Sequence, residues 1–164
     1  MFREFISYIF LFTFSIPMTI YCDEIPGTVK LGNYLWQKCN YGEDVDDCSG
    51  EPKKMEWKDA IEVCRSLKLA GKKWRLPEIE ELQSIIVCKN SKKPAYRDSC
   101  GKGNFDKPAI DKGRFPTTQS FFYWSNTEKK NDTFYSLFVD FETGLSNYNA
   151  RSIPMYVRCV SNAQ

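Results

Sequence analysis

Residues 57–86 read WKDAIEVCRSLKLAGKKWRLPEIEELQSII, and this stretch decides the fold. Counted from Trp57, apolar side chains recur three, four, seven and ten positions later, which places them on one face of an α-helix. The residues at these positions are Ala60, Ile61, Cys64 and Leu67. Gly71 then favours the left-handed backbone that ends a helix. The first half of the stretch therefore predicts an amphipathic helix.

The second half of the stretch predicts another helix. Pro77 suits a first helical turn, and the carboxylates that follow it suit the positive end of the helix dipole. A buried stripe would consist of Ile79, Leu82, Ile85 and Ile86. The residues that we expect to be structural rather than catalytic are Trp57, Trp74, Arg75, Pro77 and Glu81. Of these, the arginine would pair with the glutamate or bind backbone carbonyls.

The segments on both sides of this helix pair predict β-structure. Upstream, residues 31–39 resemble a strand, and residues 40–54 are rich in Gly, Asp and Pro and resemble a loop. Downstream, residues 89–119 lack periodicity and predict a long loop. The last third predicts a strand from Tyr123, an alternating strand over 133–141, a hairpin return from Leu145 and a final strand over 155–160. The fold class is therefore α+β.

The amino terminus predicts export. Residues 5–16 form a short apolar stretch of about twelve residues, which is typical of a signal peptide and too short to span a bilayer. We expect cleavage after Cys22, so that residues 1–22 are the signal peptide and residues 23–164 the domain. Lipid attachment at Cys22 and an uncleaved anchor are the alternatives. The expected location is the periplasm, the outer surface or the medium, with no transmembrane helix.

Cysteine usage supports export. Seven cysteines become six without Cys22, and an even number in an exported chain of this size indicates three disulfides. Six cysteines allow fifteen pairings. Order and proximity favour bonds between Cys39 and Cys48, between Cys88 and Cys100, and between Cys64 and Cys159. A metal site would need paired cysteines at CxxC spacing, and the sequence contains none.

Composition excludes several classes of function. The chain has 164 residues, a formal net charge of +2 and no histidine. Without histidine the usual general base and most zinc sites of mixed ligation are missing, so we expect neither an enzyme nor a metal or cofactor. The small net charge does not indicate a nucleic-acid partner. The acidic residues of the 40–54 loop lack the spacing of a calcium-binding loop, so no calcium is expected.

Six spaced motifs resemble the Lcl C-terminal domain family, a family of bacterial domains. The motifs are Trp57…Cys64, Leu69-Ala70-Gly71, Trp74-Arg75-Leu76-Pro77…Glu81-Leu82, Pro108-Ala109-Ile110-Asp111…Phe115-Pro116, Tyr123-Trp124-Ser125 and Val157-Arg158-Cys159-Val160. The resemblance covers about residues 34–160. It departs from the family's pattern at Glu78, where a hydroxyl residue often stands, and no collagen-like G-X-Y repeat is present.

The resemblance implies a C-type-lectin-like fold, of the variety shared with formylglycine-generating enzyme, in which two helices flank one small irregular antiparallel sheet. It also implies export from bacteria and, for some members, attachment to host glycans or surfaces. Related lectin-like folds often place ligand contacts in the hairpin return, which here carries Tyr148, Asn149 and Arg151. Trp124 and Asn126 could stack on a sugar ring and bond its hydroxyls, or else Trp124 is a core residue.

Three functions follow from these observations. The first is a secreted or surface-exposed binding module, of the adhesin type, for a glycan or a host protein. The second is a structural component of the bacterial envelope that binds envelope proteins and no small ligand. The third is an activity like that of formylglycine-generating enzyme, which would need a reactive cysteine pair and is therefore disfavoured.

Overall fold

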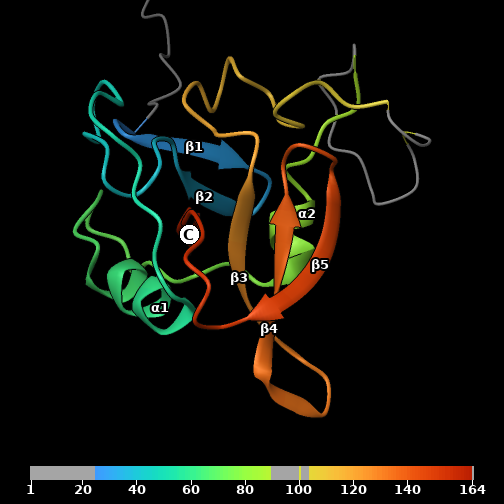
Figure 1. Ribbon diagram of the computed structural model, residues 1–164. Helices are drawn as coiled ribbons and strands as arrows, with labels where there is room; N and C mark the ends of the chain where they lie inside the picture. The colour runs from blue at the N-terminus through green and yellow to red at the C-terminus, as the bar shows by residue number, and fades with distance from the viewer. Residues whose placement is uncertain (1–24, 90–99, 101–103, 164) are drawn as a thin grey trace, which may run out of the picture.

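The computed structural model describes residues 25–89, 100 and 104–163 (Figure 1). The expected signal peptide and Cys22 lie outside the described residues. Within the described part of the chain, neither helix is long and apolar enough to cross a membrane. The two helices are α1 (Trp57–Ser66) and α2 (Ile79–Gln83). The strands are β1 (Thr28–Leu31), β2 (Tyr34–Gln37), β3 (Phe122–Lys129), β4 (Asp132–Asp140), β5 (Leu145–Ala150) and β6 (Val160–Asn162).

These elements confirm the α+β class but not the expected single sheet. Two three-stranded sheets are present, one in the order β1-β2-β6 and one in the order β3-β4-β5, and every neighbouring pair of strands is antiparallel. Because β2 pairs with β6, the two ends of the described chain meet in the first sheet.

The expected strand over 31–39 is present as the shorter β2, and it is the second strand of a hairpin with β1. Leu31 pairs with Tyr34, so Gly32 and Asn33 form a two-residue turn between β1 and β2. Gly32 has a φ of 57°, a left-handed conformation that glycine adopts at little cost. The expectation missed β1 and began the strand too early because it did not use this Gly-Asn turn signal.

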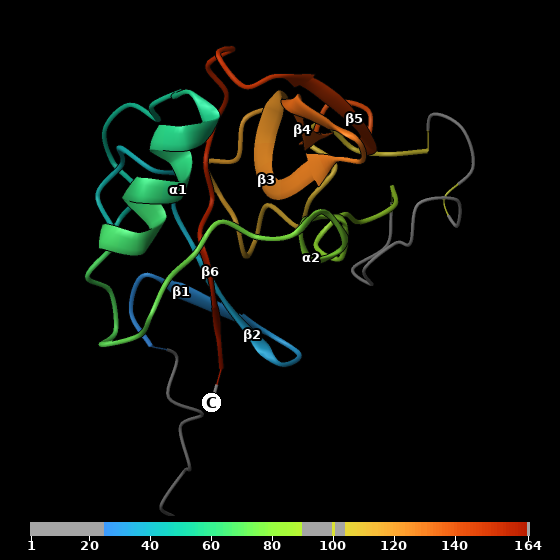
Figure 2. The same ribbon diagram turned by 90° about the horizontal axis from the view of Figure 1, so that it is seen from below.

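The expected final strand over 155–160 is also wrong in its extent. Only β6 is a strand, and the residues before it bond in turn to several other segments: Met155 to Met55, Tyr156 to β3, and Val157 through its carbonyl to the Tyr41 N–H. Figure 2 shows this segment running from the β3-β4-β5 sheet to the β1-β2-β6 sheet. Backbone bonds from one segment therefore join the two sheets.

Arg158 lies in this segment, and its side chain is fully buried. Its guanidinium donates to the carbonyls of Gln37 and Lys38, to Asn40 Oδ1 at 3.0 Å and to Thr118 Oγ1 at 2.8 Å. No carboxylate touches it among the described residues. The nearest negative charge is that of Glu43, which reaches the guanidinium only through Asn40 (Asn40 Nδ2 to Glu43 Oε1, 3.1 Å).

Burial governs the titration of this network. It lowers the pKa of Arg158, while the neighbouring Tyr123 and Glu43 act in the opposite direction. Burial also raises the pKa of Tyr123 to about 12. The Tyr123 hydroxyl therefore stays protonated and donates to Asn40 Oδ1 at 2.6 Å.

The first helix begins at Trp57 as predicted, but both helices are shorter than expected. The first ends at Ser66, so Leu67 and the predicted stop at Gly71 lie beyond it, and α2 ends at Gln83, so Ile85 and Ile86 lie beyond the helix, although both are buried. Pro77 precedes the N-cap Glu78 and is not in the first turn of α2.

Glu78 and Glu81 form a capping box at the start of α2, each carboxylate accepting a backbone N–H of the other residue. The carboxylate that follows Pro77 thus serves as the cap.

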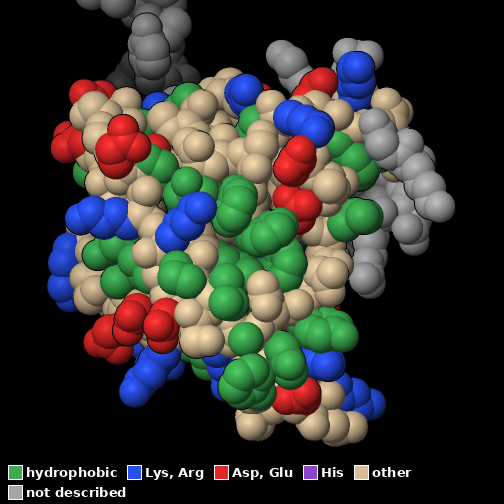
Figure 3. Space-filling view, in the orientation of Figure 1, with side chains coloured by type: hydrophobic (Ala, Val, Ile, Leu, Met, Phe, Trp, Pro, Cys, Tyr) green, Lys and Arg blue, Asp and Glu red, His purple; other side chains and the backbone are tan. Residues whose placement is uncertain are grey.

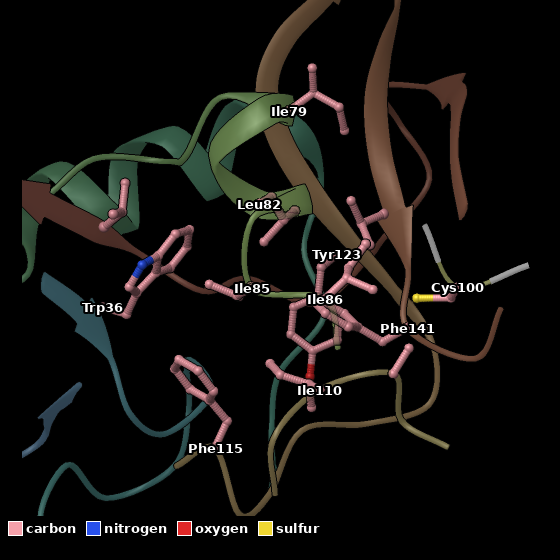
Figure 4. Packing of buried hydrophobic residues seen from close by; sticks show 13 residues of the cluster. Trp36, Ile79, Leu82, Ile85, Ile86, Cys100, Ile110, Phe115, Tyr123 and Phe141 are labelled. Carbon is pink, nitrogen blue, oxygen red and sulfur yellow. The ribbon is translucent and has the colours of Figure 1, made fainter. Parts of the chain in front are cut away.

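Two hydrophobic clusters form the core. One lies between the two sheets and α2, where Trp36, Leu82, Ile85 and Tyr123 converge with Phe115 and Phe141 (Figure 4). The other packs α1, through Ala60 and Cys64, against Trp74, Trp124 and the C-terminal segment. The amphipathic face predicted for the first helix is therefore a core face.

The three disulfides join the pairs expected from order and proximity. They link Cys39 to Cys48, Cys88 to Cys100, and Cys64 in α1 to Cys159 beside β6. The Cys64–Cys159 bond spans 95 residues, whereas the other two span 9 and 12. The long bond therefore holds α1 against the C-terminal segment.

An ion pair between Arg75 and Glu81 holds the segment before α2 against the helix, and protonation of Glu81 in acid breaks it. Arg75 Nη1 and Nη2 each lie 2.6 Å from an oxygen of Glu81. Burial alone would raise the pKa of Glu81, but its bonds to Arg75 and to the Glu78 N–H outweigh burial, and the net result is a pKa below the ordinary 4.5. A lowered folded-state pKa stabilises the protein above about pH 4.5, and this contribution is lost as the pH falls through the folded-state pKa.

Replacing Glu81 with Gln should therefore lower stability at pH 7 and flatten its dependence on pH below 5. Urea denaturation at pH 7 and at pH 3 measures both effects, with Glu80→Gln as a control on the same helix that breaks no ion pair. We expect the Glu81→Gln and wild-type midpoints to differ at pH 7 and to converge at pH 3. An equal difference at both pH values would contradict the assigned role.

A groove beside Tyr148

An open groove of about 600 Å³ lies where the start of α2 faces the β3-β4-β5 sheet. Ile79, Leu137 and Tyr148 contribute apolar surface to it. Its polar lining consists of Glu80, Thr127, Glu128, Lys129, Lys130, Ser146 and Asn147. The groove thus combines a small number of apolar side chains with hydroxyl, amide and charged groups, which can donate hydrogen bonds to a polar ligand or accept them from it.

The register of the sheet explains the position of Tyr148. Tyr148 on β5 pairs with Leu137 on β4, and opposite residues of antiparallel strands point to the same face. That face is covered by α2 over Val139 but extends past the helix at Tyr135 and Tyr148. Tyr148 is therefore 48% exposed, one of the most exposed large apolar side chains of the described chain.

A lysine lies on the Tyr148 ring. The Lys129 ammonium is 3.8 Å from the centre of that ring and 4.8 Å from the centre of the Tyr135 ring, and the two tyrosines meet edge to face at 5.6 Å. Asp132 lies 3.7 Å from the same ammonium. Cation–π contact holds the amine at the ring, where it can donate to a ligand.

Sequence reasoning did not find Lys129 or Tyr135. The signal was available, because Lys129 pairs with Asp132 across a two-residue turn at Lys130 and Asn131. A hairpin at this position brings the end of β3 beside the start of β4, and Asn131, with a φ of 62°, is a residue type that tolerates the left-handed turn.

The groove's polar wall is held by side-chain bonds. Gln83 Nε2 donates to Ser146 Oγ at 2.9 Å and so connects α2 with β5. At the start of α2, Glu78 accepts from Thr127 Oγ1 at 2.7 Å and from Asn126 Nδ2 at 2.8 Å. These bonds fix the helix relative to the sheet, so the groove is formed before any ligand binds.

Asn149 and Arg151 do not line this groove. Asn149 lies on the opposite face of β5, and its Oδ1 accepts the Ala150 N–H at 2.9 Å. Arg151 lies 4.0 Å over the Trp57 ring, donates through Nε to Ser136 Oγ at 2.8 Å and is 3.1 Å from Glu128. Of the three residues predicted in the hairpin return, only Tyr148 is in the groove.

Of the two alternatives for Trp124, the structure shows the core residue and not the exposed stacking surface. Its side chain is fully buried, and its indole N–H donates to the Met55 carbonyl at 3.1 Å. Asn126 is partly buried and is engaged with Glu78 as described above. Trp74 is also buried, with its indole N–H on the Leu69 carbonyl at 2.8 Å.

A second surface feature is an aromatic patch that we define as Phe121, Phe122, Phe138 and Tyr156. Their rings are in contact, with 4.6 Å between the centres of Phe121 and Phe122 and 4.7 Å between Phe122 and Phe138. The Lys54 ammonium lies 3.7 Å over the Phe121 ring. Figure 3 shows hydrophobic side chains gathered in the middle of the face that carries β3 and β4.

Within the part of the chain that the structure describes, no three His, Cys, Asp or Glu side chains are grouped closely enough to hold a metal ion. The groove's own side chains offer stacking on Tyr148 and hydrogen bonding to amide, hydroxyl and charged groups.

The family model of the Lcl C-terminal domain matches residues 30–161. The chain belongs to the Lcl C-terminal domain family. The match covers both sheets, both helices and the Tyr148 groove of this Lcl C-terminal domain. A search of curated proteins gave no match.

Proposed function

We propose that this Lcl C-terminal domain is an exported, non-enzymatic binding module that holds a glycan in the groove beside Tyr148. The observation that carries the proposal is the half-exposed Tyr148 ring, set among hydroxyl, amide and charged side chains in a groove. A pyranose ring can stack on such an aromatic surface while its hydroxyls bond to the polar lining. Lys129, already at the ring, would supply a donor.

Three disulfides support export, because such bonds persist mainly outside the cytoplasm. They also support a non-enzymatic role, since the six cysteines from Cys39 onward are all bonded and a formylglycine-generating reaction needs reactive thiols. The sequence has no histidine to act as a base.

We further propose that the domain is C-type-lectin-like. Support comes from the pairing of β2 with β6, which brings the chain ends together, and from the bond between Cys64 and Cys159, which ties α1 to the C-terminal segment. Solving the structure by crystallography and superposing it on lectin domains tests this arrangement.

A second candidate is a protein partner from the envelope or the host. The observation that favours it is the aromatic patch, in which Phe121 is exposed, Phe122 and Tyr156 are partly buried and Phe138 is buried, because exposed apolar surface on a small domain can mark a protein contact. Capture of one stoichiometric partner by the wild type but not by Phe121→Ala would favour this function over glycan binding.

The direct test of the first proposal uses residues 23–164, produced with disulfides formed and screened against a glycan array. We expect Tyr148→Ala to weaken binding of any glycan found by about tenfold or more, because loss of a stacking surface costs on the order of 1.4 kcal/mol or more. Isothermal titration calorimetry measures this change.

The control for this variant is Phe134→Ala. Phe134 is 62% exposed and lies on the opposite face of β4, so its loss removes similar aromatic area without touching the groove. A glycan that binds both variants equally well contradicts the groove assignment. Absence of binding to every glycan on the array contradicts the proposed function itself.

A further inference from the structure

The outer edge of β5 carries backbone groups that no other strand uses. In the β3-β4-β5 sheet, β5 is a terminal strand (Figure 1). The other edge of the sheet, formed by β3, is covered by backbone bonds from Trp124 N to the Tyr156 carbonyl and from Asn126 N to the Pro77 carbonyl. Within the described residues, only the β5 side of this sheet remains open to a further strand.

The register identifies which groups point outward from β5. Just past the strand, Arg151 donates its N–H inward to the Phe134 carbonyl. Inward and outward residues alternate along an antiparallel strand, so Ser146, Tyr148 and Ala150 direct their N–H and C=O groups away from β4. The side-chain bonds agree, because the Tyr148 N–H is held by Asn147 Oδ1 and the Ala150 N–H by Asn149 Oδ1, each at 2.9 Å.

This edge lacks the devices that usually block strand addition. Residues 145–150 read LSNYNA, with no charged residue and no proline. All six residues pair with β4 in unbroken register, without a bulge. Exposed edges in soluble proteins are normally protected by charge, proline or a bulge. Among the described residues, the outward N–H groups of Tyr148 and Ala150 meet only asparagine side chains, which a competing carbonyl can displace by accepting the same N–H. The Ala150 carbonyl accepts the Ile153 N–H at 3.0 Å and keeps a second lone pair for a partner strand.

We propose that β5 pairs antiparallel with β5 of a second copy of this chain, with Tyr148 of each copy on the two-fold axis. The two sheets then form one continuous six-stranded sheet. In a symmetric antiparallel pair centred on Tyr148, the numbers of two facing residues add up to twice 148. Ser146 therefore faces Ala150 of the other copy. All three outward residues of each strand then exchange hydrogen bonds, and a register centred on any other residue engages fewer of them.

The side chains of the strand are self-complementary in this register. Asn147 of one copy faces Asn149 of the other on the same side of the sheet, so each asparagine displaced from its own edge gains an amide partner. The two Tyr148 rings lie side by side on the other face of the sheet, which is the face that carries the groove. In a symmetric pair, any charge on the strand would lie near the same charge on the other copy. Because β5 carries no charged residue, pairing brings no like charges together.

Two cations lie near the pairing line. Lys129 rests on Tyr148 and is balanced by Asp132, and Arg151 just past the strand is balanced by Glu128. Each positive charge thus has a carboxylate on its own copy. Because Tyr148 lines the groove and faces Tyr148 of the other copy, a dimer would place its two grooves next to each other on one face of the continuous sheet.

Analytical ultracentrifugation of residues 23–164, from about 1 µM to about 1 mM, measures the association. We expect a monomer–dimer equilibrium in the wild type. Ala150→Pro removes one outward N–H without touching a bond to β4, and Asn149→Lys places a charge on the edge; neither residue lines the groove. Each variant should raise the dissociation constant by about tenfold or more.

The control is Thr133→Lys, which adds the same charge at an exposed position on β4, outside the β5 edge. Amide hydrogen exchange gives a second readout, since the amides of Tyr148 and Ala150 should become protected as the wild-type concentration rises. A wild type that stays monomeric, or a dimer unaffected by Asn149→Lys in folded protein, overturns the proposal. Protection of these amides only when another protein is added would assign the edge to a foreign strand.

Discussion

Replacing Cys64 and Cys159 together by alanine should lower the free energy of unfolding by about 4–5 kcal/mol. The bond closes a loop of 95 residues, and in the chain-entropy model the stabilisation from a cross-link grows with the length of the loop that it closes. A domain of this size has a total stability of roughly 5–15 kcal/mol, so the change removes a large share. Thermal unfolding followed by circular dichroism measures it.

The matched control replaces Cys39 and Cys48, which close a loop of only 9 residues. The same model assigns that bond about 3 kcal/mol or less, so its removal should lower the melting temperature by a clearly smaller amount. If the two double variants melt at the same temperature, the long bond does not have the dominant role that we assign to it. Mass spectrometry confirms that the remaining bonds have formed.

Replacing Arg158 with methionine should destabilise the protein by about 3–5 kcal/mol, because removing one member of a buried polar network leaves its partners unsatisfied. The variant strands the carbonyls of Gln37 and Lys38 together with Asn40 Oδ1 and Thr118 Oγ1. It also removes the positive charge that faces Glu43 across Asn40. Chemical denaturation of both proteins gives the difference.

A double-variant cycle with Glu43→Gln separates the two contributions. If charge balance matters, the double variant should be more stable than the sum of the two single changes predicts. Arg114→Met serves as the control, because Arg114 is exposed and its ion pair with Asp111 is long, at 3.6 Å. A small effect of Arg158→Met, similar to that of the control, would show that water can replace the guanidinium.

Much of the fold follows from local signals in the sequence. The spacing of apolar residues after Trp57 gives α1 and its buried face, and Pro77 gives the start of α2. The disulfide pairing favoured by order and proximity, one of the fifteen that six cysteines allow, is confirmed. The helix signals are local and can be read without knowing the tertiary structure, whereas the sequence alone did not exclude the other pairings.

The parts that the sequence did not predict depend on long-range contacts. The segment before β6 has the alternation of a strand, but its backbone partners lie on several elements, so it is not a strand over 155–159. Burial of Trp124 likewise depends on Met55 and the C-terminal segment packing around it. No local pattern distinguishes such a tryptophan from an exposed one.

The candidate site was predicted only in part for the same reason. Tyr148 was predicted because it lies in the hairpin return, where related lectin-like folds often place ligand contacts. Arg151 has the composition of a binding residue, but it stacks on Trp57, which is 94 positions away in the sequence and adjacent only in the folded chain. Lys129 became relevant only once the turn at Asn131 placed it over Tyr148.

The order of the disulfides along the chain affects how the protein is made. The Cys64–Cys159 bond encloses the Cys88–Cys100 bond, so in an exported chain, as we propose, Cys64 would leave the export channel long before Cys159. An oxidase that joins thiols as they appear would connect Cys64 to Cys88 first. The native set would then be reached by thiol–disulfide exchange, which is the reaction that a disulfide isomerase catalyses.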